Sequence, residues 1–139
     1  MKERIQYFCF LLIALIALCF TYPEEKLLLP SKLSETIKDP KAPKPLIFNV
    51  GPTPMIKGAK FIGNAEDPAN KERLKNALKD IPKNKEVVIY CGCCKLVDCW
   101  NISEADKILS SQGFTNYKIL NMPTDFTEDW LNKGYPIEQ

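Results

Sequence analysis

The chain has 139 residues, of which 45% are hydrophobic and 26% are charged, a size that suits one hydrophobic core and is too small for two ordinary domains. It carries 19 lysine and arginine residues against 17 aspartate and glutamate residues, scattered along the sequence, which excludes the dense basic face of a nucleic-acid-binding protein. The sequence contains 0 histidines, so Ser-His-Asp and Cys-His catalysis, histidine metal ligation and histidine pH sensing are excluded within the chain.

The first 21 residues have the pattern of an export signal. Lys2 and Arg4 precede an apolar run from Tyr7 to Phe20, as in the basic and apolar regions of a secretory signal. The run is shorter than the roughly 20 residues that cross a bilayer comfortably. We therefore expect residues 1–21 to be a signal peptide or an N-terminal membrane anchor, attached to the membrane through residues 5–20. The expected location is the periplasm or the outer side of the inner membrane.

The remaining residues, 22–139, alternate predicted strands with predicted helices. Compact apolar runs predict buried strands at 46–50, 87–90 and 117–120, with a short first strand after residue 22 and a short extended piece within 55–63. Helical periodicity predicts a short helix through Leu33 and Ile37 that is capped by Ser31 or a neighbour, and longer helices at 68–78, from about 101 to 113 and at 126–133. This alternation predicts one α/β domain with a central, mainly parallel sheet flanked by helices.

Four cysteines lie between the predicted strand 87–90 and the helix that follows it: Cys91, Cys93, Cys94 and Cys99. A loop that leads from the carboxyl end of a parallel strand into a helix is where open α/β sheets bind their ligands. Thiols react as thiolates, and backbone amides, helix amino termini and nearby cations favour the thiolate. Cys91 directly follows the strand and is therefore the predicted nucleophile. Lys95 is the cation expected to lower the pKa of Cys91.

The second thiol is a separate question. Cys91 and Cys94 have the Cys-x-x-Cys spacing of dithiol redox centres, so Cys94, or else Cys93, could attack a persulfide on Cys91. A permanent disulfide, for instance to Cys99, would instead brace the loop in an oxidising compartment. Four cysteines permit three full pairings, so the connectivity stays open.

A metal site is a further alternative for this loop. Structural zinc sites draw pairs of ligands from two separated turns, whereas these cysteines crowd one loop. Copper(I), which accepts fewer and softer ligands, suits the loop better. The main function that we expect from the sequence requires no cofactor.

From about Leu29 to Ile137 the order of these segments resembles the rhodanese-like domain. The residues that carry the resemblance are Leu46–Val50, Ile56–Ala59, Val87–Cys91 and the closing Trp130–Pro136. A narrower pattern consists of Cys91-Gly92-Cys93-Cys94 with Cys99 and Asn101, followed by Met122–Phe126 and Trp130. It is similar to an exported bacterial subgroup of the family that carries a Cys-Gly-Cys-Cys loop.

The resemblance implies a single rhodanese-like domain over residues 22–139 that forms a persulfide on Cys91 and passes the sulfur to a thiol acceptor, with Cys94 as second catalytic thiol. The expected loop or substrate-binding residues are Gly92, Cys93, Lys95, Cys99 and Asn101, the last as a helix cap. The expected partners of this monomer are a small sulfur donor and a thiol or protein acceptor, without nucleic acid. The alternatives are a thiol-disulfide oxidoreductase that uses Cys91 and Cys94, and a non-catalytic binding module braced by disulfides.

The chain departs from the family pattern at two places. The family often has Asp-x-Arg at the end of the first long strand, where this chain has Asn49 and Gly51. Its cysteine loop has Lys95 as the one cation, whereas a thiosulfate dianion benefits from guanidinium forks. The sequence therefore favours persulfide or disulfide exchange over the use of thiosulfate.

Overall fold

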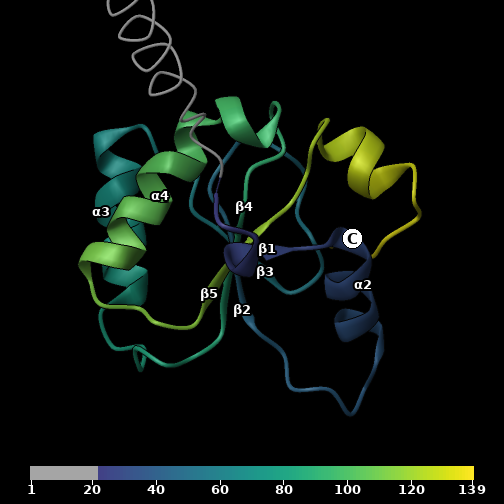
Figure 1. Ribbon diagram of the computed structural model, residues 1–139, viewed down its shortest axis with the longest axis horizontal. Coiled ribbons are helices and arrows are strands. Elements are labelled where there is room, and N and C mark those ends of the chain that lie inside the picture. The colour runs from purple at the N-terminus through teal and green to yellow at the C-terminus, as the bar shows by residue number, and fades with distance from the viewer. Residues whose placement is uncertain (1–21) are drawn as a thin grey trace, which may run out of the picture.

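Short runs of β-branched and aromatic side chains form a parallel sheet in the computed structural model, which describes residues 22–139 (Figure 1). The strands are β1 (Leu27–Leu28), β2 (Leu46–Asn49), β3 (Ala59–Phe61), β4 (Val87–Tyr90) and β5 (Tyr117–Leu120), in the sheet order β1-β5-β4-β2-β3. All four pairings between neighbouring strands are parallel. The predicted α/β class with a central parallel sheet flanked by helices is confirmed. The predicted signal or anchor at 1–21 lies outside the described residues, and within 22–139 no helix is both long and apolar enough to cross a membrane.

Helices cover both faces of this sheet. They are α2 (Pro30–Lys38), α3 (Pro68–Leu78), α4 (Trp100–Ser111), the short turns η1 (Glu24–Lys26) and η2 (Leu96–Asp98), and the wide π-helical segment η3 (Thr127–Leu131). Figure 1 shows α3 and α4 on one side of the sheet and α2 with the yellow C-terminal segment on the other. The bounds predicted for α3 are confirmed, whereas the last helix is shorter than the predicted 126–133.

The predicted side-chain cap of α2 is wrong. The helix begins at Pro30, and the residue before it, Leu29, makes no capping hydrogen bond through its side chain. Proline suits the first helical position because its ring presets the backbone angle and it has no N–H to satisfy. Ser31 therefore lies inside the first turn and does not precede it.

Successive side chains of β4 point into two separate hydrophobic cores. Val88 and Tyr90 pack on the side of α2 and η3, with Leu33 and Trp130. Val87, Ile89 and the next residue, Cys91, pack on the side of α3 and α4. This alternation is the period-two geometry of a strand buried on both faces. It turns the side chain of Cys91 toward α4.

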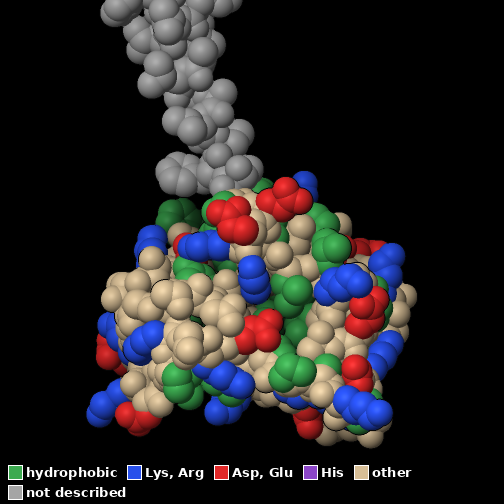
Figure 2. All heavy atoms as spheres, turned by 60° about the horizontal axis from the view of Figure 1, so that its bottom comes forward, with side chains coloured by type: hydrophobic (Ala, Val, Ile, Leu, Met, Phe, Trp, Pro, Cys, Tyr) green, Lys and Arg blue, Asp and Glu red, His purple; other side chains and the backbone are tan. Residues whose placement is uncertain are grey.

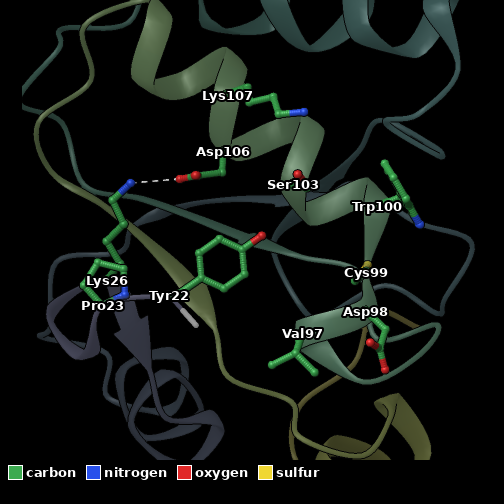
Figure 3. Close-up of a pocket in the computed structure, with 10 residues that line it drawn as sticks. All are labelled: Tyr22, Pro23, Lys26, Val97, Asp98, Cys99, Trp100, Ser103, Asp106 and Lys107. Atoms are coloured by element: carbon green, nitrogen blue, oxygen red, sulfur yellow. Dashed lines mark hydrogen bonds and ion pairs between the residues drawn. The ribbon is translucent and has the colours of Figure 1, made fainter. Parts of the chain in front are cut away.

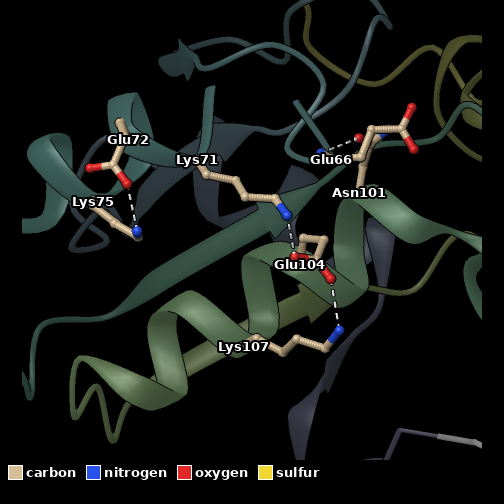
Figure 4. Close-up of polar contacts among 7 residues, drawn as sticks. All are labelled: Glu66, Lys71, Glu72, Lys75, Asn101, Glu104 and Lys107. Carbon is tan, nitrogen blue, oxygen red and sulfur yellow. Dashed lines mark hydrogen bonds and ion pairs between the residues drawn. The ribbon is translucent and has the colours of Figure 1, made fainter. Parts of the chain in front are cut away.

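The position of α4 is set mainly by its buried face. Ile102 and Ala105 of α4 belong to the same core as Leu74 of α3. At the surface, Glu104 of α4 pairs with Lys71 of α3 at 2.6 Å and with Lys107 at 2.7 Å (Figure 4). Hydrogen bonds from Lys107 and then Lys71 lower the pKa of Glu104 to about 2. Exposed ion pairs of this kind contribute only about 0–1 kcal/mol, so apolar packing holds α4 in place.

The connections that follow β2 and β4 lead toward opposite edges of the sheet. β2 leads outward to β3 on one edge, and β4 leads to β5 on the other side. Such a reversal between adjacent parallel strands opens a crevice at their carboxyl ends, where ligands bind in folds of this class. The register pairs Asn49 with Tyr90, so Gly51 and Cys91 leave the sheet side by side at this crevice. Charges of both signs are interspersed over the face seen in Figure 2.

Candidate thiol site

Cys91 is the first residue beyond β4, and its side chain is 0% exposed. Two contacts join its strand end to that of β2. The backbone N–H of Val50 donates to the carbonyl oxygen of Tyr90 at 2.9 Å, and the hydroxyl of Thr53 donates to the carbonyl oxygen of Cys91. The backbone at the end of β4 and at the predicted nucleophile is therefore held by residues that follow β2.

Gly51 makes the space that the sulfur of Cys91 occupies. A Cβ atom added at Gly51 would lie 2.2 Å from this sulfur, far inside the van der Waals distance. The backbone N–H of Gly51 donates to Asn49 Oδ1 at 3.0 Å, which holds the turn against the strand. Glycine is therefore required at position 51, because a side chain there would collide with the thiol.

Asn101 connects the thiol to the loop before α3. Its Nδ2 group donates to the sulfur of Cys91 at 3.5 Å, and its Oδ1 accepts from the backbone N–H of Glu66 at 3.1 Å (Figure 4). The side chain is buried in the first turn of α4. The expectation that Asn101 caps the helix is wrong, since α4 begins one residue earlier and the amide points away to these two partners.

The sulfur atoms of Cys91, Cys93 and Cys99 form a cluster, named here the thiol cluster, in which all three lie within 4.8 Å of one another. Cys93 lies 3.1 Å from Cys91 and 4.0 Å from Cys99, measured between sulfur atoms. Cys91 and Cys99 are buried and Cys93 is exposed, and all of these cysteines are free thiols. The thiol cluster therefore has two fixed members and one that faces solvent.

The three thiols of the cluster differ in pKa. Hydrogen bonding from the Cys99 thiol, then from the backbone N–H and the thiol of Cys93 and from Asn101, lowers the pKa of Cys91 from 9.0 to about 6, against the opposing effect of burial. Burial and then hydrogen bonding to neighbouring thiols raise the pKa of Cys93 to about 12. The hydrogen bond to Cys91, together with burial, raises the pKa of Cys99 well above its ordinary value. Cys91 is thus the thiolate at neutral pH, and its neighbours are proton donors.

The other predicted loop residues lie around this cluster. The sulfur of Cys94 is 3.4 Å from that of Cys93, and Cys94 is half-buried. Gly92 has a φ of 71°, and a Cβ atom there would lie 2.8 Å from Cβ of Phe126, so the turn after Cys91 requires glycine. Lys95 is exposed and lines a small hollow of about 200 Å³ with Tyr22. Its effect on the pKa of Cys91 stays a prediction.

A larger groove of about 680 Å³ lies beside the thiol cluster (Figure 3). It extends from Cys99 and the first turns of α4 to Tyr22 and the ion pair of Lys26 with Asp106, whose atoms are 3.0 Å apart. Trp100, on its rim, is 72% exposed and does not pack into the core. Burial and then the charge of Asp106 raise the pKa of Tyr22 to about 12. The groove offers room for a partner of the site next to its buried thiols.

Sequence reasoning missed Gly51 and the backbone N–H of Glu66. A signal for Gly51 exists, because it follows a predicted strand and parallel strands end at one edge of a sheet. No local pattern marks Glu66, whose contact with Asn101 spans 35 residues of sequence. No family model matches the chain, and no curated protein matches it.

Proposed function

We propose that this chain is a rhodanese-like sulfurtransferase or sulfur carrier that forms a persulfide on Cys91 and passes the outer sulfur to a thiol acceptor. One observation carries the proposal: a buried thiol at the carboxyl end of a central strand receives an N–H donor from the side-chain amide of Asn101 at 3.5 Å. N–H donors that are fixed in place stabilise a sulfur anion without reorganisation during the reaction. The order of segments that resembles the rhodanese-like domain supports the same reading.

The proposed reaction has two exchange steps and no net oxidation. The Cys91 thiolate attacks the outer sulfur of a persulfide donor, the donor's S–S bond breaks, and the donor leaves as a thiolate. An acceptor thiolate then attacks the outer sulfur on Cys91, takes it, and regenerates the Cys91 thiolate. The low pKa of Cys91 helps the second step, because a less basic thiolate leaves faster. The N–H donor beside the sulfur stabilises both the thiolate and the persulfide anion of Cys91.

A small persulfide suits this site better than thiosulfate. A dianion needs paired guanidinium donors, whereas the cysteine loop carries only Lys95, which is exposed. The space next to the Cys91 sulfur is closed on one side by Gly51 and Asn101. The donor therefore has to approach from the side of Cys93 and the groove.

The experiment is sulfur loading of the full-length protein, reduced and kept soluble in mild detergent, with glutathione persulfide as donor. We expect a mass gain of one sulfur atom, which is lost on addition of a thiol acceptor. Cys91→Ser should abolish the gain, whereas Cys94→Ser, the matched control at the edge of the loop, should keep it. A labile sulfur that is still carried and delivered by the Cys91→Ser protein would overturn the proposal.

The 3.1 Å distance between Cys91 and Cys93 favours a second candidate, thiol-disulfide exchange. Cys93 could attack the inner sulfur of a Cys91 persulfide, so that hydrogen sulfide leaves and a Cys91–Cys93 disulfide forms, which an external dithiol must reduce. The Cys-x-x-Cys spacing favours Cys94 for this role, but the sulfur of Cys94 contacts Cys93. Release of sulfide with loss of two titratable thiols would identify this reaction, and four cysteines that are blocked to thiol titration in the native protein would identify the disulfide-braced module instead.

A further inference from the structure

Three sulfur atoms from the start, the middle and the end of the connection between β4 and α4 lie close together. Cys91 extends β4, Cys93 lies in the loop, and Cys99 directly precedes the first residue of α4. Their mutual distances are all within 4.8 Å. Sulfur transfer through Cys91 alone does not require this convergence, and Cys99 in particular has no reacting role in the proposed cycle.

We propose that the thiol cluster is a three-coordinate binding site for copper(I), a ligand class that goes beyond the proposed sulfur transfer. Metal–thiolate bonds of about 2.3 Å in a trigonal plane place the three sulfurs about 4 Å apart. The distance between Cys93 and Cys99 is already 4.0 Å, while the 3.1 Å between Cys91 and Cys93 has to widen. The required movement falls on Cys93, the exposed member, and the two buried members stay in place.

The number of ligands favours copper(I) over zinc. Structural zinc sites are tetrahedral and need a fourth ligand. Cys94 is not among the sulfurs that lie mutually within 4.8 Å, and the sequence contains 0 histidines. Soft thiolates in low coordination number are the ligands that copper(I) prefers. Within residues 22–139 the cluster offers three such ligands, whereas the sulfur of Cys94 lies near Cys93, at 3.4 Å, and does not lie within 4.8 Å of all three.

The surroundings also suit a bound complex with excess negative charge. Three thiolates and one copper(I) ion carry a net charge of −2, which needs N–H donors when it is removed from water. Asn101 Nδ2 already donates to Cys91, and its orientation is fixed by the N–H of Glu66. On binding, the thiols that are protonated release their protons to the solvent, and copper remains in the +1 state. The ion and a persulfide on Cys91 would exclude each other.

The test is an anaerobic titration of the full-length, reduced protein with copper(I) supplied as its bathocuproine disulfonate complex. We expect the protein to withdraw one copper ion per chain from the chelator, with X-ray absorption that reports three sulfur ligands. Cys93→Ser should weaken the affinity by at least about tenfold, and Cys94→Ser should leave it unchanged. Because Cys93 and Cys94 are neighbours outside the buried core, both variants should remain folded, which circular dichroism checks.

Three outcomes would overturn the proposal: no copper withdrawn from the chelator, an equal loss of affinity in Cys93→Ser and Cys94→Ser, or two sulfur ligands instead of three. Sulfur loading of the copper-free protein is measured separately. Copper binding without sulfur uptake would contradict the proposed function and leave the copper site supported. Sulfur uptake without copper binding would support the proposed function and overturn the copper site. If both hold, copper-loaded protein should take up no sulfur.

Discussion

The side-chain amide of Asn101 has one orientation available to it. Its oxygen has to face Glu66, because a backbone N–H can only be met by an acceptor, and so its NH₂ group faces the sulfur of Cys91. The arrangement presents a donor to the thiolate and no acceptor to the thiol. Asn101 therefore acts as a positioning residue that favours the charged form of Cys91.

Replacing Asn101 by alanine is expected to raise the pKa of Cys91. A hydrogen bond contributes about 0.5–1.5 kcal/mol, which corresponds to a rise of about 0.5–1 pH unit in the midpoint. The rate of alkylation by iodoacetamide should rise with pH through about 6 in the native protein and through a higher pH in Asn101→Ala. Asn132→Ala, at an exposed amide of the C-terminal segment, is the control and should not move the midpoint. Identical profiles for all three proteins would show that Asn101 is only structural.

Two strand ends build the site at the level of elements. β2 and β4 pair in parallel, so the residues that follow them lie side by side. Tyr90 holds the turn after β2, because its hydroxyl accepts from the N–H of Ile56 at 2.9 Å and donates to the carbonyl oxygen of Pro54 at 3.1 Å. The thiol cannot move away from Gly51 without moving β4. Because of this close approach, the effect of a substitution at residue 51 should depend on whether residue 91 carries a sulfur atom.

Gly51→Ala is expected to destabilise the domain and to slow sulfur loading of Cys91. The added methyl group would overlap the sulfur, and overpacking of this kind costs about 1–3 kcal/mol. The same substitution in a Cys91→Ala background should cost much less, because the sulfur is gone. Urea denaturation of the four proteins measures this coupling, and equal costs in both backgrounds would contradict the close contact.

At the scale of the whole molecule, the stability of the reduced protein should depend on pH through one thiol. The pKa of Cys91 is lowered from 9.0 to about 6 on folding, so between these values the unfolded chain binds one proton more than the folded chain. The free energy of unfolding should then rise with pH across this window, by at most about 1.4 kcal/mol per pH unit, and the gain is lost as pH falls through 6. The thiols of Cys93 and Cys99 have raised pKa values in the folded protein, so their opposing contribution, which lowers the free energy of unfolding as pH rises, begins only as pH approaches 9, where they start to ionise in the unfolded chain.

The check is urea denaturation of the full-length protein between pH 6 and 9 under a reductant. Cys91→Ser should flatten the dependence, while Cys94→Ser should follow the native curve. A native protein whose stability is constant over this range would show that Cys91 is not a thiolate in the folded state.

The fold should also be independent of the amino-terminal 21 residues. Among the residues that the structure describes, the two hydrophobic cores are built from side chains between Tyr22 and Tyr135, all of which a chain that begins at Tyr22 contains. We expect this shortened chain to be soluble and to unfold in one sharp transition, at the same urea concentration as the full-length protein in detergent. Insolubility or a broad transition would contradict this expectation.

Local patterns are enough to predict the alternation of strands and helices, the bounds of α3 and the place of Cys91 after a buried strand, because apolar periodicity and strand burial are encoded within a few residues. They do not show which sulfur lies nearest to Cys91, or that Gly51 and Glu66 complete its surroundings. Those contacts depend on the register of β2 with β4 and on the packing of α4 against α3, which bring together groups as far apart as Gly51 and Cys91. Asn101 looks like a helix cap in the sequence and lies against the thiol in the fold for the same reason.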